Sequence, residues 1–188
     1  MQCRKFHAVG SVSQTIRMGH LKVTISSTEE DVTYVFSGEV DEDFQRTEIP
    51  KIAKKKTILD LAGISSFNSC GIREWVFWVQ DLSRDSEIKF RACSVSMIDQ
   101  INMIPQSLGR GQLESFYAPY YCEKCGEVNR LLHLRDCFSL IAQKKAPKLR
   151  CETCDRQLTF DTLESSYFLF MEHQDGATYR QNGSSEES

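Results

Sequence analysis

The sequence predicts an α/β fold in which a mixed sheet carries helices mostly on one face, followed by a smaller module. Three observations support this prediction. Some short segments alternate apolar and polar residues, others repeat apolar residues at helical spacing, and two Cys-x-x-Cys pairs stand in the C-terminal third. Strand and helix patterns alternate over residues 20–118, which is typical of a layered α/β domain. We expect the smaller module to span residues 119–172.

Size and charge narrow the class of protein. With 188 residues, of which 40% are hydrophobic, the chain can bury one proper core and one small module. The net charge of −3 provides no general field for nucleic acid or an anionic membrane. No segment approaches the roughly 20 apolar residues of a membrane span, and the first residues lack the apolar core of a signal peptide. We therefore expect a cytoplasmic protein that does not bind membranes.

The first elements follow from local pattern. Residues 1–19 show no firm period and predict an irregular N-terminal arm. Segments 21–27 and 31–40 alternate apolar and polar residues on either side of an acidic turn, which predicts a hairpin. Residues 43–56 have apolar residues at helical spacing, with Pro50 in the first turn or shortening the helix.

The remaining elements complete the alternation. The compact apolar run at 56–61 predicts a buried strand, and a helix crowded with aromatic residues follows it. We then expect a strand over 86–94, a helix over 95–105 that Pro105 ends, and a short strand over 112–119. Residues 173–188 are polar and predict a disordered tail.

The two cysteine pairs predict a metal site. Cys122 and Cys125 form one pair, Cys151 and Cys154 the other. Two cysteines three apart on a tight turn can aim both sulfur atoms at one ion, and two such turns complete a tetrahedron of thiolates. Gly126 suits such a turn because a residue there often needs a positive φ angle. The pattern resembles zinc ribbons, and it predicts structural zinc.

Other interpretations of the cysteines stay open. Iron bound as in rubredoxin uses the same four ligands, and a redox-active pair would need a lowered thiol pKa. His133 and Cys137 are substitute ligands, although the four cysteines already fill the site. Since four ligands leave no position for water or substrate, we expect the metal to stabilise the fold rather than to catalyse a reaction.

The segment between the pairs is locally basic, which keeps nucleic-acid binding open as an alternative function. In that alternative the larger domain only dimerises or acts as a scaffold. The basic residues are Arg130, Arg135, Lys144, Lys145, Lys148 and Arg150.

Residues 20–118 contain three motifs in a characteristic order. Gly-Glu-Val-Asp at 38–41 ends a strand, Asp-Leu at 60–61 lies in the next, and Ser69 with Gly71 opens a helix. This order resembles the STAS domain, the fold of bacterial anti-sigma factor antagonists. The resemblance implies a small sheet with helices on one side and a cytoplasmic bacterial regulator that binds a protein partner and is not an enzyme.

The resemblance also implies a switch at the start of the helix. In the family, the serine that matches Ser69 is phosphorylated by a kinase that is also the anti-sigma factor, and phosphorylation releases the partner. A serine at the N-cap would expose its hydroxyl where the helix dipole favours an anion. This chain departs from the family pattern, because Asn68 replaces an aspartate and Cys70 replaces a hydroxyl residue. Ser69 is therefore interpreted either as a retained cap or as a phosphorylation switch.

The helix after Ser69 has a predicted core-facing stripe and two aromatic residues outside it. Aromatic residues outside a buried stripe often mark contacts, so Phe77 and Trp78, together with Asn68, are candidate partner-binding residues. Alternatively, the zinc-ribbon-like module covers these aromatics. The predicted stripe consists of Ile72, Trp75, Val76, Val79 and Leu82.

Overall fold

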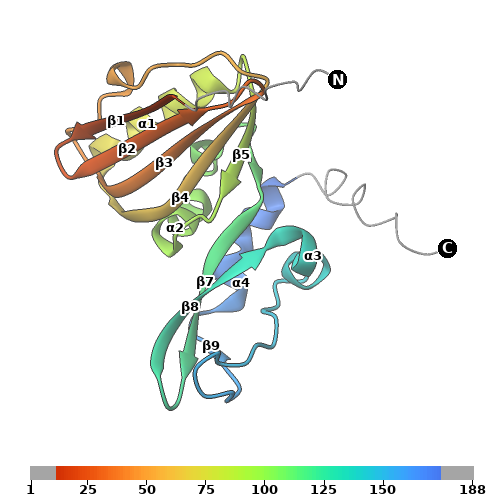
Figure 1. The fold of residues 1–188 in the computed structure, drawn as a ribbon. Coiled ribbons are helices and arrows are strands. Elements are labelled where there is room, and N and C mark those ends of the chain that lie inside the picture. Colours follow the sequence, from red (N-terminus) through yellow and green to blue (C-terminus); the bar gives the residue numbers. More distant parts are fainter. Residues whose placement is uncertain (1–11, 175–188) are drawn as a thin grey trace, which may run out of the picture.

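The computed structural model describes residues 12–174, which form two sheets (Figure 1). The first is a six-stranded mixed sheet, and the second is a three-stranded antiparallel sheet. Within the described part of the chain, no helix is long and apolar enough to cross a membrane. Residues 1–11 of the expected arm and residues 175–188 of the expected tail lie outside the described residues.

The six strands of the larger sheet lie side by side in chain order. The first three are antiparallel, and the last four run parallel to one another. The mixed sheet and the hairpin of 21–27 with 31–40 are thus confirmed. The expected irregular arm is wrong over 12–18, because these residues pair with the next strand. The strands are β1 (Val12–Met18), β2 (Leu21–Ser27), β3 (Asp31–Val40), β4 (Lys56–Phe67), β5 (Glu87–Arg91) and β6 (Gln112–Leu113).

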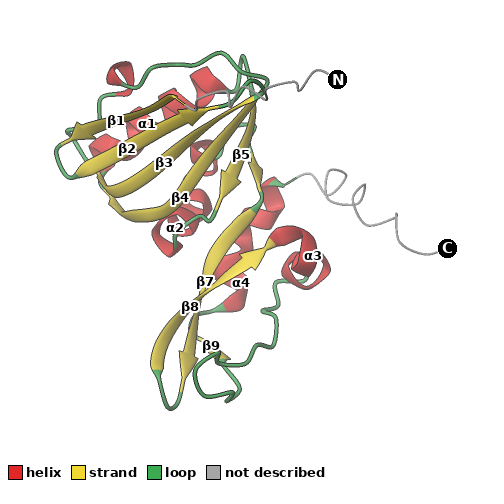
Figure 2. Cartoon of the chain, in the orientation of Figure 1, coloured by secondary structure: helices red, strands yellow, loops and turns green. Residues whose placement is uncertain are grey.

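Helices cover one face of this sheet (Figure 2). Alternate side chains of the central strands point toward them, so that Val23, Tyr34 and Leu59 are completely buried, while Val35 on the opposite face is exposed. The two long connections are therefore on the same side, as the sequence predicts. They contain α1 (Ser69–Leu82), α2 (Val95–Met103) and the short 3₁₀ helix η2 (Pro105–Ser107).

The expected helix over 43–56 is wrong. Only one 3₁₀ turn, η1 (Arg46–Glu48), forms there. The Tyr34 hydroxyl donates to the Pro50 carbonyl oxygen at 2.8 Å and accepts from the Ile52 N–H at 3.2 Å, which ties the segment to β3. Proline also disfavours helical backbone in the residue before it. The periodic apolar residues are still used, because Phe44 and Ile49 are buried in the core.

The second sheet begins inside the segment expected to end the larger domain. The predicted strand over 112–119 divides into β6, in the large sheet, and β7, the centre of the small sheet. The expected boundary at 118/119 therefore lies inside one strand. The elements are β7 (Ser115–Cys122), β8 (Gly126–His133), α3 (Leu134–Ala142), β9 (Thr159–Phe160), α4 (Glu164–Tyr167) and η3 (Phe168–His173).

An aromatic cluster joins the second module to the larger domain. The Phe116 ring of β7 lies 5.2 Å from the Phe170 ring of η3 and 6.4 Å from that of Phe168. In α2, the Asn102 side-chain amide donates to the Tyr167 carbonyl oxygen at 2.9 Å. The chain thus returns after its second cysteine pair to pack on α2. As a result, the base of the small module shares one continuous core with the large sheet.

Candidate functional site

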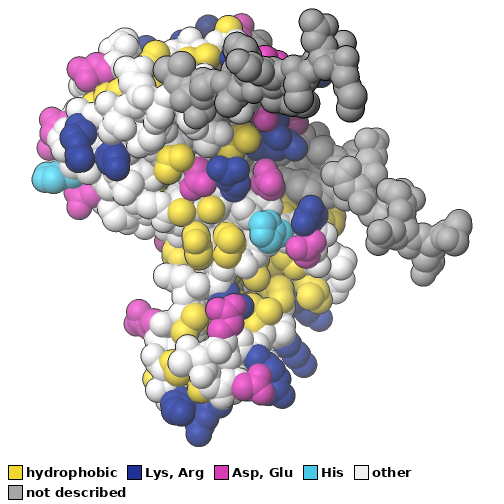
Figure 3. Space-filling model, in the orientation of Figure 1, with side chains coloured by type: hydrophobic (Ala, Val, Ile, Leu, Met, Phe, Trp, Pro, Cys, Tyr) yellow, Lys and Arg dark blue, Asp and Glu magenta, His cyan; other side chains and the backbone are white. Residues whose placement is uncertain are grey.

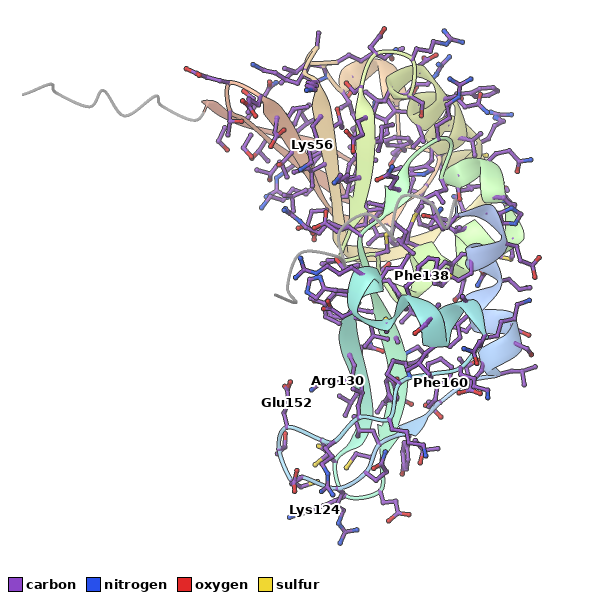
Figure 4. The ribbon with its side chains drawn as sticks, turned by 90° about the vertical axis from the view of Figure 1, so that its right-hand side faces the viewer. Lys56, Lys124, Arg130, Phe138, Glu152 and Phe160 are labelled. Atoms are coloured by element: carbon purple, nitrogen blue, oxygen red, sulfur yellow. The ribbon has the colours of Figure 1, made fainter. Side chains whose placement is uncertain are left out.

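The four paired cysteines come together at the tip of the second module. Cys122 ends β7, Cys125 lies in the turn to β8, and Cys151 and Cys154 lie in the loop before β9. All four Sγ atoms lie within 4.8 Å of one another. Figure 4 shows sulfur atoms gathered at this tip, next to Lys124.

The spacing of the sulfur atoms fits a tetrahedral metal site. The Sγ atoms of Cys122 and Cys154 are 3.5 Å apart, and those of Cys151 and Cys125 are 3.8 Å apart. A disulfide would need about 2.05 Å. A zinc ion with Zn–S bonds of about 2.3 Å requires sulfur–sulfur edges of about 3.8 Å in a regular tetrahedron. The cluster is therefore compatible with a four-thiolate metal site.

Backbone amides of the two turns favour thiolates. The Lys124 N–H lowers the pKa of Cys122, and the Thr153 N–H lowers that of Cys151 to about 6. By contrast, the neighbouring Cys154 thiol raises the pKa of Cys125 to about 12. Accumulating four negative sulfur atoms in this space therefore requires a cation.

The turn geometry confirms one expectation from the sequence. Gly126 has a φ of +84°, which its lack of a side chain permits. Asp155, directly after the second pair, also has a positive φ, of 58°.

The two possible substitute ligands, His133 and Cys137, are not part of the four-cysteine cluster. Cys137 is buried in α3, where its thiol donates to the His133 carbonyl oxygen at 3.2 Å and burial raises its pKa to about 11.

The start of α1 differs from the expectation. Asn68, not Ser69, is the N-cap: its Oδ1 accepts from the N–H groups of Cys70 at 3.0 Å and Gly71 at 2.8 Å. Ser69 is the first helical residue and is exposed. The interpretation of Ser69 as a cap is therefore wrong, and the side-chain amide of Asn68 takes that role. The Asn68 Nδ2 in turn donates to Glu42.

This assignment predicts a loss of stability for one of two neighbouring substitutions and almost no change for the other. Asn68→Ala should lower the free energy of unfolding by about 1 kcal/mol, because two backbone donors of α1 lose their acceptor. Ser69→Ala should change it by no more than about 0.5 kcal/mol. Urea unfolding followed by tryptophan fluorescence measures both. A larger loss for Ser69→Ala than for Asn68→Ala would contradict the cap.

Trp78 is not a surface contact residue. Its side chain is completely buried, with its ring 5.5 Å from that of Tyr34 and 5.4 Å from that of Phe36. The large sheet covers it, so neither the small module nor a partner does. The stripe prediction is wrong at two positions, since Val76 is only partly buried and Trp78 is in the core.

Phe77 is exposed, as predicted, and lines a groove beside α1. The ring is 45% exposed, and the Arg46 guanidinium lies 5.4 Å from its centroid. The groove, of about 420 Å³, runs between α1 and the segment around η2, and Ser69 lies in the same wall. The lining residues are Ser69, Ile72, Arg73, Val76, Phe77, Ile104 and Gln106. Asn68, the third candidate contact residue, is exposed beside the groove rather than in its lining.

Sequence reasoning missed the second wall of this groove. Ile104 and Gln106 form this wall, at the end of the predicted helix over 95–105 and just beyond it. The available signal was the partly apolar end of the predicted helix over 95–105, beyond its buried face.

The comparisons with other proteins add no further residues to either site. No protein-family model matches the chain, and a search of curated proteins found no match.

Proposed function

We propose that this chain is a non-catalytic regulatory module that binds a protein partner through the groove beside α1 and is switched by phosphorylation of Ser69. The partner is a regulator, such as a kinase of the anti-sigma type. The observation that carries the proposal is that Ser69 and Phe77 line the same apolar groove. An exposed aromatic residue in an apolar hollow is a typical anchor point for a protein partner.

The order of elements supports a relation to STAS domains. An antiparallel pair precedes parallel strands, and α1 begins directly after β4, with its phosphorylation candidate at the first helical position. The Gly-Glu-Val-Asp motif at 38–41 ends β3 beside the start of α1, since the Asn68 N–H donates to the Val40 carbonyl oxygen at 3.1 Å. Two of the three motifs of the resemblance thus lie together at one end of the sheet, whereas Asp60 and Leu61 lie in the middle of β4.

A phosphate on Ser69 would act on the groove by charge. Because Asn68 already accepts from the Cys70 and Gly71 amides, the phosphate need not displace the cap. It would add about −1.5 to −2 charges at the groove. Arg73 lies four residues along the same side of α1, within reach of a phosphate on Ser69. Phosphorylation would therefore reverse the sign of the charge at this end of the groove.

Capture of partners from cell extract tests the switch. We expect wild type and Ser69→Ala to retain the same partner, and Ser69→Asp to lose at least about 90% of it, since a charge is placed in the interface. Ser139→Asp, at an exposed serine of α3, is the matched control and should retain the partner. Equal capture by Ser69→Asp and wild type would refute the phosphorylation switch.

We further propose that the ion held by the four cysteines is zinc and that it is structural. The sulfur distances of 3.5 and 3.8 Å match zinc, and the four ligands leave no open coordination position. Cys122 and Cys151 are buried, which favours a structural role over exchange with external thiols. Iron is the alternative that the same ligands permit.

The charge distribution favours protein binding over nucleic-acid binding. Four of the six basic residues on which the nucleic-acid alternative rests are paired with carboxylates of this chain, which weakens their attraction for a phosphate backbone. Figure 3 shows Lys and Arg side chains next to Asp and Glu side chains around the tip. The pairs are Arg130–Glu152, Arg135–Asp136, Lys144–Glu172 and Arg150–Asp155.

A further inference from the structure

The exposed surface of α1 has two sides of different charge. On one side, the carboxylates Glu74 and Asp81 face η1 and its flanking loop, where Arg46 and Lys51 bind them at 2.9 to 3.2 Å. This side is neutralised within the chain. The other side forms the wall of the groove.

A second hollow lies further along α1, beyond Phe77. Its volume is about 270 Å³, and it lies between the C-terminal end of α1, with the two residues that follow the helix, and the residues after η2. Together the hollows follow most of α1, a helix of 14 residues and about 21 Å. The residues that line the second hollow are Gln80, Ser83, Arg84, Gly109 and Arg110.

The charged residues that line the two hollows are all arginines. Arg73 lies in the apolar hollow, and Arg84 and Arg110 lie in the second; no carboxylate lines either one. Arg84 is within 3.4 Å of Asp81, which also binds Arg46 and Lys51. Within residues 12–174, neither Arg73 nor Arg110 is paired with a carboxylate. The groove therefore combines apolar walls with uncompensated positive charge.

From this combination we infer that the occupant of the groove is an acidic amphipathic helix of a protein partner. Its apolar side chains pack against Ile72, Val76 and Phe77, and its carboxylates pair with Arg73 and Arg110. A helix in a groove is anchored by apolar residues at spacings of three and four, which suits a hollow parallel to α1. This inference rests on the proposed function, since it defines the partner of the same groove. It also explains the switch, because a phosphate on Ser69 would compete for Arg73 and repel the acidic helix.

A synthetic peptide tests the inference directly. The probe is a fluorescein-labelled helical peptide of about 18 residues, with leucines along one face and glutamates on the other. Its twin carries lysine at every glutamate position. In fluorescence anisotropy titrations with the full chain, we expect the acidic peptide to bind at least about tenfold more tightly than its twin. The double variant Arg73→Glu, Arg110→Glu should weaken the acidic peptide by about tenfold or more.

Two further variants make the test specific. Phe77→Ala should weaken both peptides, because an apolar wall of the groove is lost. Arg17→Glu is the charge control: Arg17 is an exposed residue of the edge strand β1, away from the groove, and its substitution should change the affinity less than about twofold. Circular dichroism verifies that each variant is folded.

The inference is overturned if neither peptide binds, if both bind equally, or if Arg17→Glu weakens binding as much as the double variant. These outcomes are separate from those of the proposed function. A partner that Ser69→Asp releases, together with failure of the acidic peptide, leaves the switch standing and removes the acidic helix. If the acidic peptide binds and Ser69→Asp captures as much partner as wild type, the acidic helix stands and the phosphorylation switch is refuted.

Discussion

Replacing Cys151 with serine is expected to abolish stoichiometric metal binding and to unfold the tip of the second module. Structural zinc sites of this type contribute apparent binding free energies of about 10–16 kcal/mol at neutral pH. Few other interactions stabilise the fold of the tip. Its strand β9 contains only two residues, and most charged side chains of the tip are exposed. Elemental analysis of the purified wild type should give one zinc per chain. Iron with visible thiolate absorption would instead identify an iron site.

The loss of structure should remain local. Hydrogen exchange should rise in residues 122–126 and in the loop over 150–158, while α1 and the large sheet stay protected. The aromatic cluster at the base of the module belongs to the main core, so we expect it to stay packed without the metal. Cys137→Ser is the matched control, because Cys137 is buried but lies outside the four-cysteine cluster. Full metal content in the Cys151→Ser variant would contradict the ligand assignment.

Gly71→Ala is expected to destabilise the larger domain by about 3 kcal/mol. A Cβ atom at Gly71 would overlap the Val40 carbonyl oxygen and lie 2.8 Å from the Asp41 backbone nitrogen. Both are backbone atoms, one at the end of β3 and one in the turn that follows, so no side chain can move to make room. The first turn of α1 must therefore shift away from β3. This outcome is opposite to helix propensity, which favours alanine by about 1 kcal/mol.

Urea unfolding monitored by fluorescence of the buried Trp75 and Trp78 measures this effect. Cys70→Ala is the control, since Cys70 is the exposed neighbour in the same helical turn, and it should change the unfolding free energy by no more than about 0.5 kcal/mol. A stabilising effect of Gly71→Ala would show that α1 does not approach β3 as closely as the structure indicates.

The candidate sites differ in how far local sequence could predict them. The four cysteines were identified because two thiols on one tight turn point the same way, and the turn is encoded by adjacent residues such as Gly126. The expected helix over 43–56 failed because its period was real but Pro50 and a hydrogen bond to Tyr34 determined the backbone. Trp78 was misplaced because the buried face of α1 is rotated about the helix axis relative to the predicted stripe. Val76 therefore lies at its margin, and Trp78 packs on Tyr34 and Phe36.

The sequence by itself determined the strands with alternating side chains, the helix after Asn68 and the set of four cysteines that cluster as candidate metal ligands. Each depends on residues within a few positions of one another. Only the tertiary structure decided that Asn68 rather than Ser69 caps α1, that the second module shares the main core, and that Ile104 forms a wall opposite Phe77. These features depend on contacts between segments far apart in the chain. Local pattern carries no information about which of many compatible surfaces such segments will meet.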